Sequence, residues 1–385
     1  MLRCRFVRIL LDYRPALRER TGVGEFVHEL TRALAAHRLR LGRGDQLAVL
    51  STSSKDRPSR DLAAELPGVE VVDRRIPLRA ITWSWNRLGW PPVEWFAGPA
   101  DVVHAQSPFI IPTLNAARVI TIHDLDFLKH PESTHAEMQR DYPALVRKHA
   151  SRADQIVVSS HYTASEVTRQ LGVPRYRLTV CSPGAPRWAS DIARQRAGSD
   201  LGSTILFIGT LEPRKNVAGL LDAYEQLLVR RPDAPTLVIA GRITDAAAPL
   251  VARVERPPLA GSVQLLGYVP DRGRPLLYRQ ARMLVLPSFD EGFGLPVLEA
   301  MASGVPVIVS DHGSLPEVAG DAAVPIPPDN VAAISAEMER LLERDAARQA
   351  ISRGLVQASR YTWESCAAAA LDAYRGAIAN QARRS

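Results

Sequence analysis

The chain of 385 residues contains few cysteines, and their spacing fits neither a metal site nor a disulfide framework. Cys4, Cys181 and Cys366 are odd in number and stand far apart. This pattern predicts reduced thiols in a cytoplasmic protein and gives no indication of a zinc site.

Long apolar runs are also missing. No stretch reaches the roughly 20 consecutive apolar residues that a membrane-spanning helix needs. The first residues, MLRCRFVRILLDYRP, carry arginines at positions 3, 5 and 8 inside the apolar run. A signal peptide needs an uninterrupted apolar core, so we expect a buried first strand and a soluble protein.

The second half of the chain lacks the excess of positive charge that the first half has. Residues 1–190 hold 27 Lys and Arg against 19 Asp and Glu, whereas residues 191–385 hold 21 against 22. The basic half also contains a tryptophan-rich segment, residues 74–95. Tryptophans among arginines suit peripheral contact with an anionic membrane, here its inner face, or an anionic acceptor; local packing of the aromatic rings would give the same pattern. The segment contains Arg74, Arg75, Arg79, Trp83, Trp85, Arg87, Trp90 and Trp95.

Short apolar runs alternate with amphipathic segments along the chain, beginning with RILLD and ending with VPVIVSD and AAVPIP. Strands that alternate with helices predict parallel βαβ units, hence an α/β fold of two Rossmann-like, doubly wound domains. The polar stretch PRWASDIARQRAGSDLGS interrupts the pattern and predicts a linker. The expected parts are an N-terminal domain over 1–186, a linker over 187–202, a C-terminal domain over 203–364, and a C-terminal helix over 365–385 that packs back toward the N-terminal domain.

Ligands of open parallel sheets bind beyond the carboxyl ends of the strands, so the loops there are the candidate site. After the predicted strand ILFIG, Pro213 is followed by Arg214 and Lys215 directly before a helix. Two cations and a helix N-terminus suit a diphosphate, although a solvated basic turn is the simpler alternative.

Two glutamates stand eight positions apart in the stretch EGFGLPVLEAMASG. Glu291 belongs to a glycine-rich loop, and Glu299 to the first turns of a helix. Gly292 and Gly294 allow the loop backbone to approach a ligand closely. Neither glutamate has a further ligand at metal spacing, so both fit better as acceptors for hydroxyl pairs. The alternative is helix N-terminal acidity, which contributes only about 0.3–1 kcal/mol.

Gly22 and Gly24 open a predicted helix in the first half, but Val27 stands where the dinucleotide fingerprint has its third glycine. No acidic residue ends the following strand, so NAD binding is disfavoured. Gly24 still allows the helix N-terminus to approach a phosphate. His123 ends the predicted strand RVITIHD, where a structural and a functional role are equally compatible with the sequence.

These motifs resemble those of the retaining glycosyltransferases of family 4, also called glycosyl transferases group 1, which have the GT-B fold. The similarity runs through RERTGVGEFVHEL, VITIHDLDFLKHPE, GTLEPRKNV, GYVPD and EGFGLPVLEAMASGVPVIVSDHGSLPEVAGDAA. Bacterial mannosyltransferases of surface-polysaccharide assembly are most similar. The loop SPGAP, where relatives have an Asn-Gly pair, departs from the pattern. The resemblance implies an acceptor-binding N-terminal domain, a nucleotide-sugar-binding C-terminal domain, and a deep cleft between them.

The resemblance also implies residue roles. Glu299 would hold the ribose hydroxyls and Glu291 the hydroxyls of the donor sugar, while the two cations stabilise the leaving diphosphate. The implied catalytic residues are His123, Arg214, Lys215 and Glu291. The implied donor-binding residues are Gly22, Gly24, Gly209, Arg214, Lys215, Tyr268, Val269, Glu291, Gly292, Phe293, Gly294, Leu295 and Glu299.

The implied reaction is metal-independent, cofactor-independent transfer of a hexose with retention, mannose being favoured over glucose. The donor would be GDP-mannose or UDP-glucose, and the acceptor a glycan, a lipid-linked molecule or a small molecule such as a secondary metabolite. Two alternatives remain open, a nucleotide-sugar epimerase or hydrolase of the same fold and a non-catalytic nucleotide- or glycan-binding scaffold. No nucleic-acid partner is expected, because the chain has no recognition motif for one.

Overall fold

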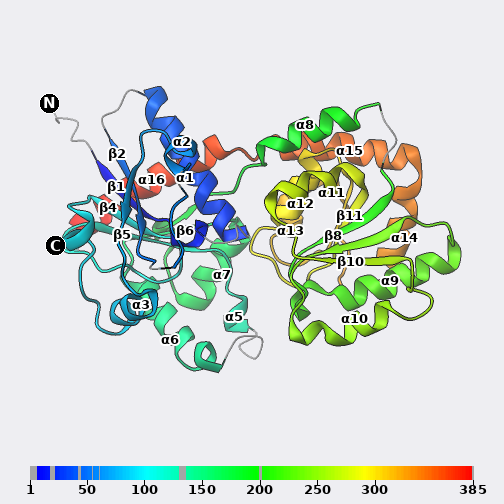
Figure 1. Ribbon diagram of the computed structural model, residues 1–385, viewed down its shortest axis with the longest axis horizontal. Coiled ribbons are helices and arrows are strands. Elements are labelled where there is room, and N and C mark those ends of the chain that lie inside the picture. Colours follow the sequence, from blue (N-terminus) through cyan, green and yellow to red (C-terminus); the bar gives the residue numbers. More distant parts are fainter. Residues whose placement is uncertain are drawn as a thin grey trace. The chain divides into compact units, whose positions relative to one another are not determined.

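The computed structural model describes residues 7–17, 22–41, 45–53, 55–59, 61–129, 136–198 and 202–383, without the side chains of 38–41 and 136–141. The chain divides into two compact units (Figure 1). Unit 1 comprises Met1–Pro183 and Thr362–Ser385, and unit 2 comprises Gly184–Tyr361. Each has helices around a parallel sheet, which confirms the predicted fold class of two doubly wound α/β domains.

Unit 1 is built on a seven-stranded parallel sheet with the order β3-β2-β1-β4-β5-β6-β7. Its central strands are buried on both faces, as parallel strands between two layers of helices must be. Their aliphatic side chains form two core clusters, one on each face. The strands are β1 (Arg8–Asp12), β2 (Gln46–Ser51), β3 (Glu70–Asp73), β4 (Val102–Ala105), β5 (Ala117–Ile122), β6 (Gln155–Val158) and β7 (Leu178–Val180).

The helices of unit 1 follow local sequence signals. At the start of α7, the Ser160 side chain accepts a hydrogen bond from the Thr163 N–H; at its end, Gly172 has a φ of 66°. A side-chain N-cap and a left-handed glycine are standard helix boundaries. The helices are α1 (Gly22–Leu41), α2 (Leu62–Glu65), α3 (Leu78–Arg87), α4 (Glu94–Ala97), α5 (Asp126–Lys129), α6 (Ala136–Arg152), α7 (His161–Leu171) and α16 (Trp363–Ala382), with 3-10 turns at Arg14–Ala16 and Arg175–Arg177.

Unit 2 is built on a five-stranded parallel sheet with the order β10-β9-β8-β11-β12. The run AAVPIP, expected to be a strand, contributes only an isolated bridge between Ser310 and Ile326. The two prolines of this run explain the difference, because proline cannot donate to a sheet ladder. The strands are β8 (Thr204–Ile208), β9 (Thr236–Ala240), β10 (Val263–Gly267), β11 (Ala281–Leu286) and β12 (Val307–Val309).

The predicted linker over 187–202 was wrong for most of its length, because Arg187–Arg196 form α8 of unit 2. Ile192 is buried in the core, and Arg196 donates hydrogen bonds to the carbonyls of Gly304 (3.1 Å) and Arg279 (2.8 Å). The helix looks like a linker in sequence because its exposed face is strongly polar. The other helices are α9 (Val217–Arg230), α10 (Ala248–Val254), α11 (Arg274–Gln280), α12 (Leu295–Ala302), α13 (Leu315–Ala319), α14 (Val331–Leu342) and α15 (Arg344–Ala358), with 3-10 turns at Pro213–Lys215, Asp245–Ala247, Asp271–Gly273 and Gly320–Ala322.

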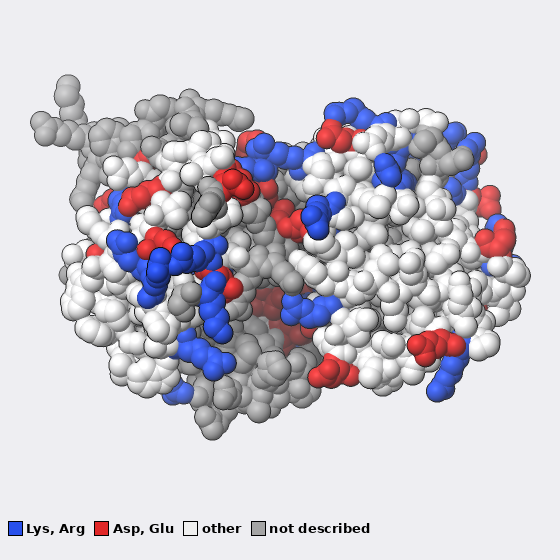
Figure 2. Space-filling view, in the orientation of Figure 1, with Lys and Arg blue, Asp and Glu red and all other residues white. Residues whose placement is uncertain are grey.

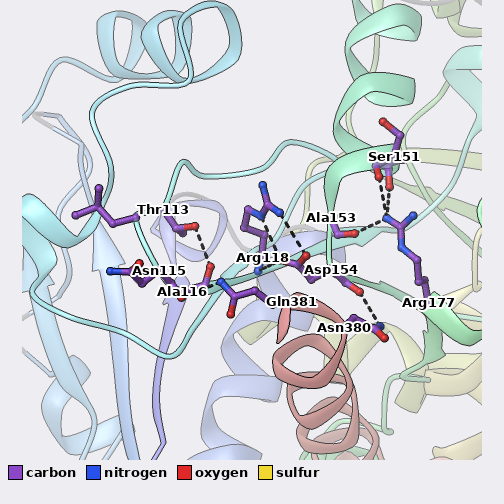
Figure 3. A network of polar contacts seen from close by, with 12 residues as sticks. Thr113, Asn115, Ala116, Arg118, Ser151, Ala153, Asp154, Arg177, Asn380 and Gln381 are labelled. Carbon is purple, nitrogen blue, oxygen red and sulfur yellow. Dashed lines mark hydrogen bonds and ion pairs between the residues drawn. The ribbon is translucent and has the colours of Figure 1, made fainter. Parts of the chain in front are cut away.

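The C-terminal helix α16 belongs to unit 1, although the chain reaches it only after passing through unit 2. It packs against α1 and the strands β5 and β6. Near its end, Asn380 Nδ2 donates to the Asp154 carbonyl (3.0 Å) and Gln381 Nε2 to the Asn115 carbonyl (2.8 Å), as Figure 3 shows. Among the described residues, no helix is long and apolar enough to cross a membrane.

A buried polar contact also fastens α16 to the sheet. The Tyr374 hydroxyl lies 2.9 Å from His104 Nδ1, and the Nε2 of this ring lies 2.8 Å from Thr121 Oγ1. Burial, and then the nearby His123, lower the pKa of His104 to about 3, so the ring is neutral near pH 7. The C-terminal segment is therefore part of the N-terminal unit's core rather than an appendage.

We expect Tyr374→Phe to lower the free energy of unfolding by about 1–2 kcal/mol, because it leaves a buried ring nitrogen with a poorer partner. Gln106 Nε2, at 3.3 Å from His104 Nδ1, is the remaining neighbour. Tyr176→Phe is the matched control, because Tyr176 is 69% exposed, and it should change stability by less than about 0.5 kcal/mol. Urea denaturation measures both; equal stability of the two variants would contradict the role of the contact.

Candidate active site

The candidate site of unit 2 lies in the loops that follow β8 and β11. These strands are hydrogen-bonded neighbours and run parallel, so their carboxyl ends bring the two loops to one edge of the sheet. The first loop leads through the 3-10 turn Pro213–Lys215 into α9, and the second leads from Pro287 to Gly294 into α12. The sequence placed its two cations and two glutamates on these loops and on α12.

Lys215, Arg214 and Glu291 form one charged cluster between the loops. Lys215 Nζ lies 2.5 Å from Glu291 Oε1, and Arg214 Nη1 lies 3.5 Å from Oε2. Ser288 Oγ donates a further hydrogen bond to Oε1 at 2.8 Å. The Glu291 side chain is 8% exposed and that of Lys215 12%. The predicted residues are thus brought together, and Ser288 is a partner that the sequence did not indicate.

The environment of Glu291 keeps its carboxylate ionised. Burial raises the pKa of Glu291, but the charges of Lys215 and then Arg214 lower it by more than burial raises it. The pKa of Glu291 therefore lies below its ordinary value. Arg214 also lies 3.0 Å from Glu212 Oε1. Both cations therefore have carboxylate partners. An anionic ligand at this place would share the cations with these carboxylates or replace the carboxylates.

Two glycines fix the backbone around Glu291. Gly294 has a φ of 92°, and a Cβ on it would lie 2.5 Å from Leu315 Cδ2. Gly313 has a φ of 66°, and a Cβ on it would lie 2.6 Å from the Glu291 nitrogen. Ser314 donates its N–H (3.0 Å) and its hydroxyl (2.9 Å) to the Glu291 carbonyl. The sequence explained Gly294 by access to a ligand, and its positive φ is a second reason for glycine at this position.

Glu299 lies in α12, where its side chain is 2% exposed and both of its oxygens have partners. Arg274 of α11 forms an ion pair with Oε1, and the Tyr278 hydroxyl donates to Oε2 at 2.6 Å. Tyr278 in turn stacks on Trp188 of α8, with ring centroids 5.4 Å apart. Burial raises the pKa of Tyr278 well above its usual value, so the hydroxyl keeps its proton. Neither Arg274 nor Tyr278 was predicted as a partner, because no motif marks them.

The other donor-site residues predicted for unit 2 follow the strands β8, β10 and β11. Gly209 follows β8, and its N–H donates to the Ala240 carbonyl at 2.9 Å. Tyr268 and Val269 follow β10 and are half-buried. Gly292 and Phe293 are buried, and Leu295, the first residue of α12, is half-buried.

Gly22, Gly24 and His123 lie in unit 1. Gly22 is the first residue of α1, so the amides of this turn have no acceptor within the helix. A Cβ on Gly24 would lie 2.8 Å from the Pro15 carbonyl oxygen, so close packing requires glycine at this position. Burial lowers the pKa of His123 to about 4 against the opposing effect of Asp124. Its enclosed Nε2 has no hydrogen-bond partner among the described residues.

Comparisons with known proteins identify the class. Residues 20–186 match the family Glycosyltransferase Family 4, and residues 191–354 match Glycosyl transferases group 1. The sucrose-phosphate synthase structure from Thermosynechococcus elongatus has the same fold, with a TM-score of 0.73 and 20% identity over 96% of this chain and 98% of that one. The chain belongs to the family 4 glycosyltransferases, also described as glycosyl transferases group 1, and it has the GT-B fold.

Two curated relatives match nearly the whole chain. The O-antigen chain mannosyltransferase B of Escherichia coli is 33% identical over 391 residues, which cover 96% of this chain and 100% of the relative. The glycogen synthase of Mycobacterium tuberculosis is 27% identical over 390 residues, which cover 92% of this chain and 91% of the relative. Both names are those of sugar-transferring enzymes, and this chain is a glycosyltransferase by its family.

We expect Glu291→Gln to lower the free energy of unfolding by about 2–3 kcal/mol near pH 7, because it removes a charge that holds two cations. A lowered folded pKa contributes stability above the ordinary value of 4.5, and the contribution is lost as the pH falls through the folded value. The difference between wild type and variant should therefore shrink in acid.

Urea denaturation at a series of pH values measures this difference. Glu255→Gln is the matched control, since Glu255 is an exposed glutamate of the same unit; it should change stability by less than about 0.5 kcal/mol. A Glu291→Gln effect that stays constant from neutral to acid pH would show that charge pairing is not its cause.

Proposed function

We propose that this glycosyltransferase moves a mannosyl residue from GDP-mannose to a glycan acceptor, with retention at the anomeric carbon. The transfer chemistry rests on one observation, the buried cluster of Lys215, Arg214 and Glu291 at the ends of two neighbouring strands. The choice of mannose rests on the full-length similarity to a mannosyltransferase. The name of that relative also favours a polysaccharide as acceptor, including one that is lipid-linked.

In this proposal Arg214 and Lys215 stabilise the leaving diphosphate. Both precede α9, whose first amides point toward the same loop, and cations together with a helix N-terminus suit phosphate oxygens. Charge grows on the diphosphate as its bond to the sugar breaks, and preorganised cations stabilise that charge most. Two protein cations would do here what a divalent metal does in other sites, so the reaction is proposed to need none.

Retention follows if the acceptor attacks on the face from which the diphosphate leaves. The bond between the anomeric carbon and the phosphate oxygen breaks, a bond to the acceptor oxygen forms, and the acceptor proton passes to the departing phosphate. Glu291 is held by two cations and Ser288, and we assign it to the hydroxyls of the donor sugar rather than to nucleophilic attack. A carboxylate with these partners orients hydroxyls well, because it accepts several hydrogen bonds.

The remaining donor contacts are proposed by position. Glu299 would accept hydrogen bonds from the ribose hydroxyls, in competition with Arg274 and Tyr278, which hold it in the present structure. Tyr268 and Val269 would lie against the base. From unit 1, His123 would orient the sugar as a neutral ring. The N-terminal turn of α1, which contains Gly22 and Gly24, would bind a phosphate.

A glucosyl residue from UDP-glucose is the second candidate, favoured by the similarity to a glycogen synthase over 92% of the chain. Both candidates use the same leaving-group chemistry and differ in the base and in the sugar hydroxyls. We propose that the reaction takes place in the cytoplasm, where nucleotide sugars are the donors.

A panel of nucleotide sugars tests the proposal. With a mannose-terminated oligosaccharide as acceptor, GDP-mannose should give a product one hexose heavier by mass spectrometry, and NMR should show an unchanged anomeric configuration. UDP-glucose should react more slowly. Epimerised or hydrolysed donor without acceptor would instead identify an epimerase or hydrolase, and tight donor binding without any turnover would identify a scaffold.

Lys215→Ala should raise the barrier to transfer by about 2–4 kcal/mol, a loss of about 30- to 900-fold in kcat, because the departing charge loses a preorganised cation. Binding of GDP, measured by calorimetry, should weaken much less. Lys55→Ala, which truncates an exposed lysine of unit 1, is the control and should leave kcat unchanged. A loss of GDP binding with normal turnover would refute the leaving-group role.

A further inference from the structure

Helix α3 of unit 1 presents two different faces. Ile81 and Trp85, four positions apart, are 5% and 3% exposed and face the core. Arg79, Trp83 and Arg87, again spaced by four, are exposed. Residues spaced by four lie on one face of a helix, so an arginine, a tryptophan and a second arginine form a single stripe toward solvent.

Exposed apolar side chains continue this stripe beyond the helix. Leu88 is 63%, Trp90 53% and Trp95 62% exposed. Trp90 and Trp95 meet edge to face with ring centroids 5.4 Å apart, and the Ser84 hydroxyl donates to the Trp90 carbonyl. The three exposed tryptophans leave on the order of 400 Å² of aromatic surface in solvent, which is within the range of about 300–600 Å² for the largest apolar patch of a typical monomer, a patch that is often functional.

Of the four tryptophans, only Trp85 is buried in the core, whereas Trp90 and Trp95 contact each other but stay exposed. Trp85 Nε1 donates to the Pro91 carbonyl at 3.0 Å, and its ring stacks on Phe96 with centroids 6.2 Å apart. Arg14 lies 5.0 Å above the same ring. This anchored side chain holds the segment on the core, so the exposed rings stand on a fixed support rather than on a loose loop.

The segment that carries the exposed rings is basic in sequence. The residues from Arg74 to Val93 include four arginines and no acidic residue. Glu94, which follows, is turned inward and accepts hydrogen bonds from the amides of residues 114–116. Arg75 and Arg79 are exposed, and Figure 2 shows several basic side chains, with acidic ones among them, on one face of unit 1.

We infer that Trp83, Leu88, Trp90 and Trp95, together with Arg75 and Arg79, form a surface that docks unit 1 on an anionic lipid bilayer. Tryptophan rings enter the headgroup region of a bilayer, and arginines beside them pair with anionic lipids. A basic segment with exposed aromatic rings is complementary to such a surface. The inference does not depend on the donor sugar; if the proposed acceptor is lipid-linked, docking would bring it to the enzyme.

Co-sedimentation with vesicles tests the inference. The full chain should bind phosphatidylcholine vesicles that contain phosphatidylglycerol, bind pure phosphatidylcholine weakly, and be released by added salt. The triple variant Trp83→Ser, Trp90→Ser, Trp95→Ser should lose binding. The double variant Arg75→Gln, Arg79→Gln should bind about 30-fold more weakly, from the contribution of each arginine near an anionic surface.

Matched controls lie on unit 2. Arg348→Gln with Arg353→Gln removes two exposed charges, and Val229→Ser with Val356→Ser removes two exposed apolar side chains. Both should bind vesicles like the wild type. All variants should keep the wild-type melting temperature and turnover of soluble substrate, which separates loss of docking from misfolding and from failure of the proposed reaction.

Two results would overturn the inference. Equal binding of the site variants and the controls would show that the tryptophans do not contact lipid. Absence of vesicle binding, together with self-association that the triple variant abolishes, would show that the surface binds a second copy of the chain instead.

Discussion

The ion pair between Lys215 and Glu291 is the contact on which the candidate site depends. Its residues lie 76 positions apart, and they meet because β8 and β11 are parallel neighbours whose strand ends share one edge of the sheet. The pair also explains why a buried carboxylate stays ionised there: the cost of burial is offset by two cations and a hydroxyl. Contacts within the chain itself therefore hold the candidate site together.

The two glutamates of one short segment have different surroundings, and the difference assigns them different proposed tasks. Glu291 is held by cations of the preceding loop, so it belongs to the part of the site where a diphosphate and its sugar would lie. Glu299 is held by Arg274 and the Tyr278 hydroxyl from the neighbouring helix α11. In the proposed reaction these two similar side chains would serve separate parts of one ligand, because backbone geometry points them to different partners.

The tryptophan-rich segment shows how a core and a surface are built from one run of sequence. Helix periodicity sends Trp85 inward beside Ile81, and sends Trp83 outward between two arginines. Burial of Trp85 supports the segment, while the exposed rings remain available to an anionic surface. The proposed docking surface belongs to unit 1, whereas the charged cluster of the candidate site belongs to unit 2.

The sequence by itself determined most of the sheet strands, the helix boundaries marked by Ser160 and Gly172, the two doubly wound domains, and the family, since these depend on local periodicity, capping residues and contiguous motifs. Only the tertiary structure decided that 187–196 are a packed helix rather than a linker, and which tryptophan is buried. It also supplied Ser288, Arg274 and Tyr278 as partners of the two glutamates. Such contacts depend on which elements lie next to each other in space, and no local pattern in the chain records that.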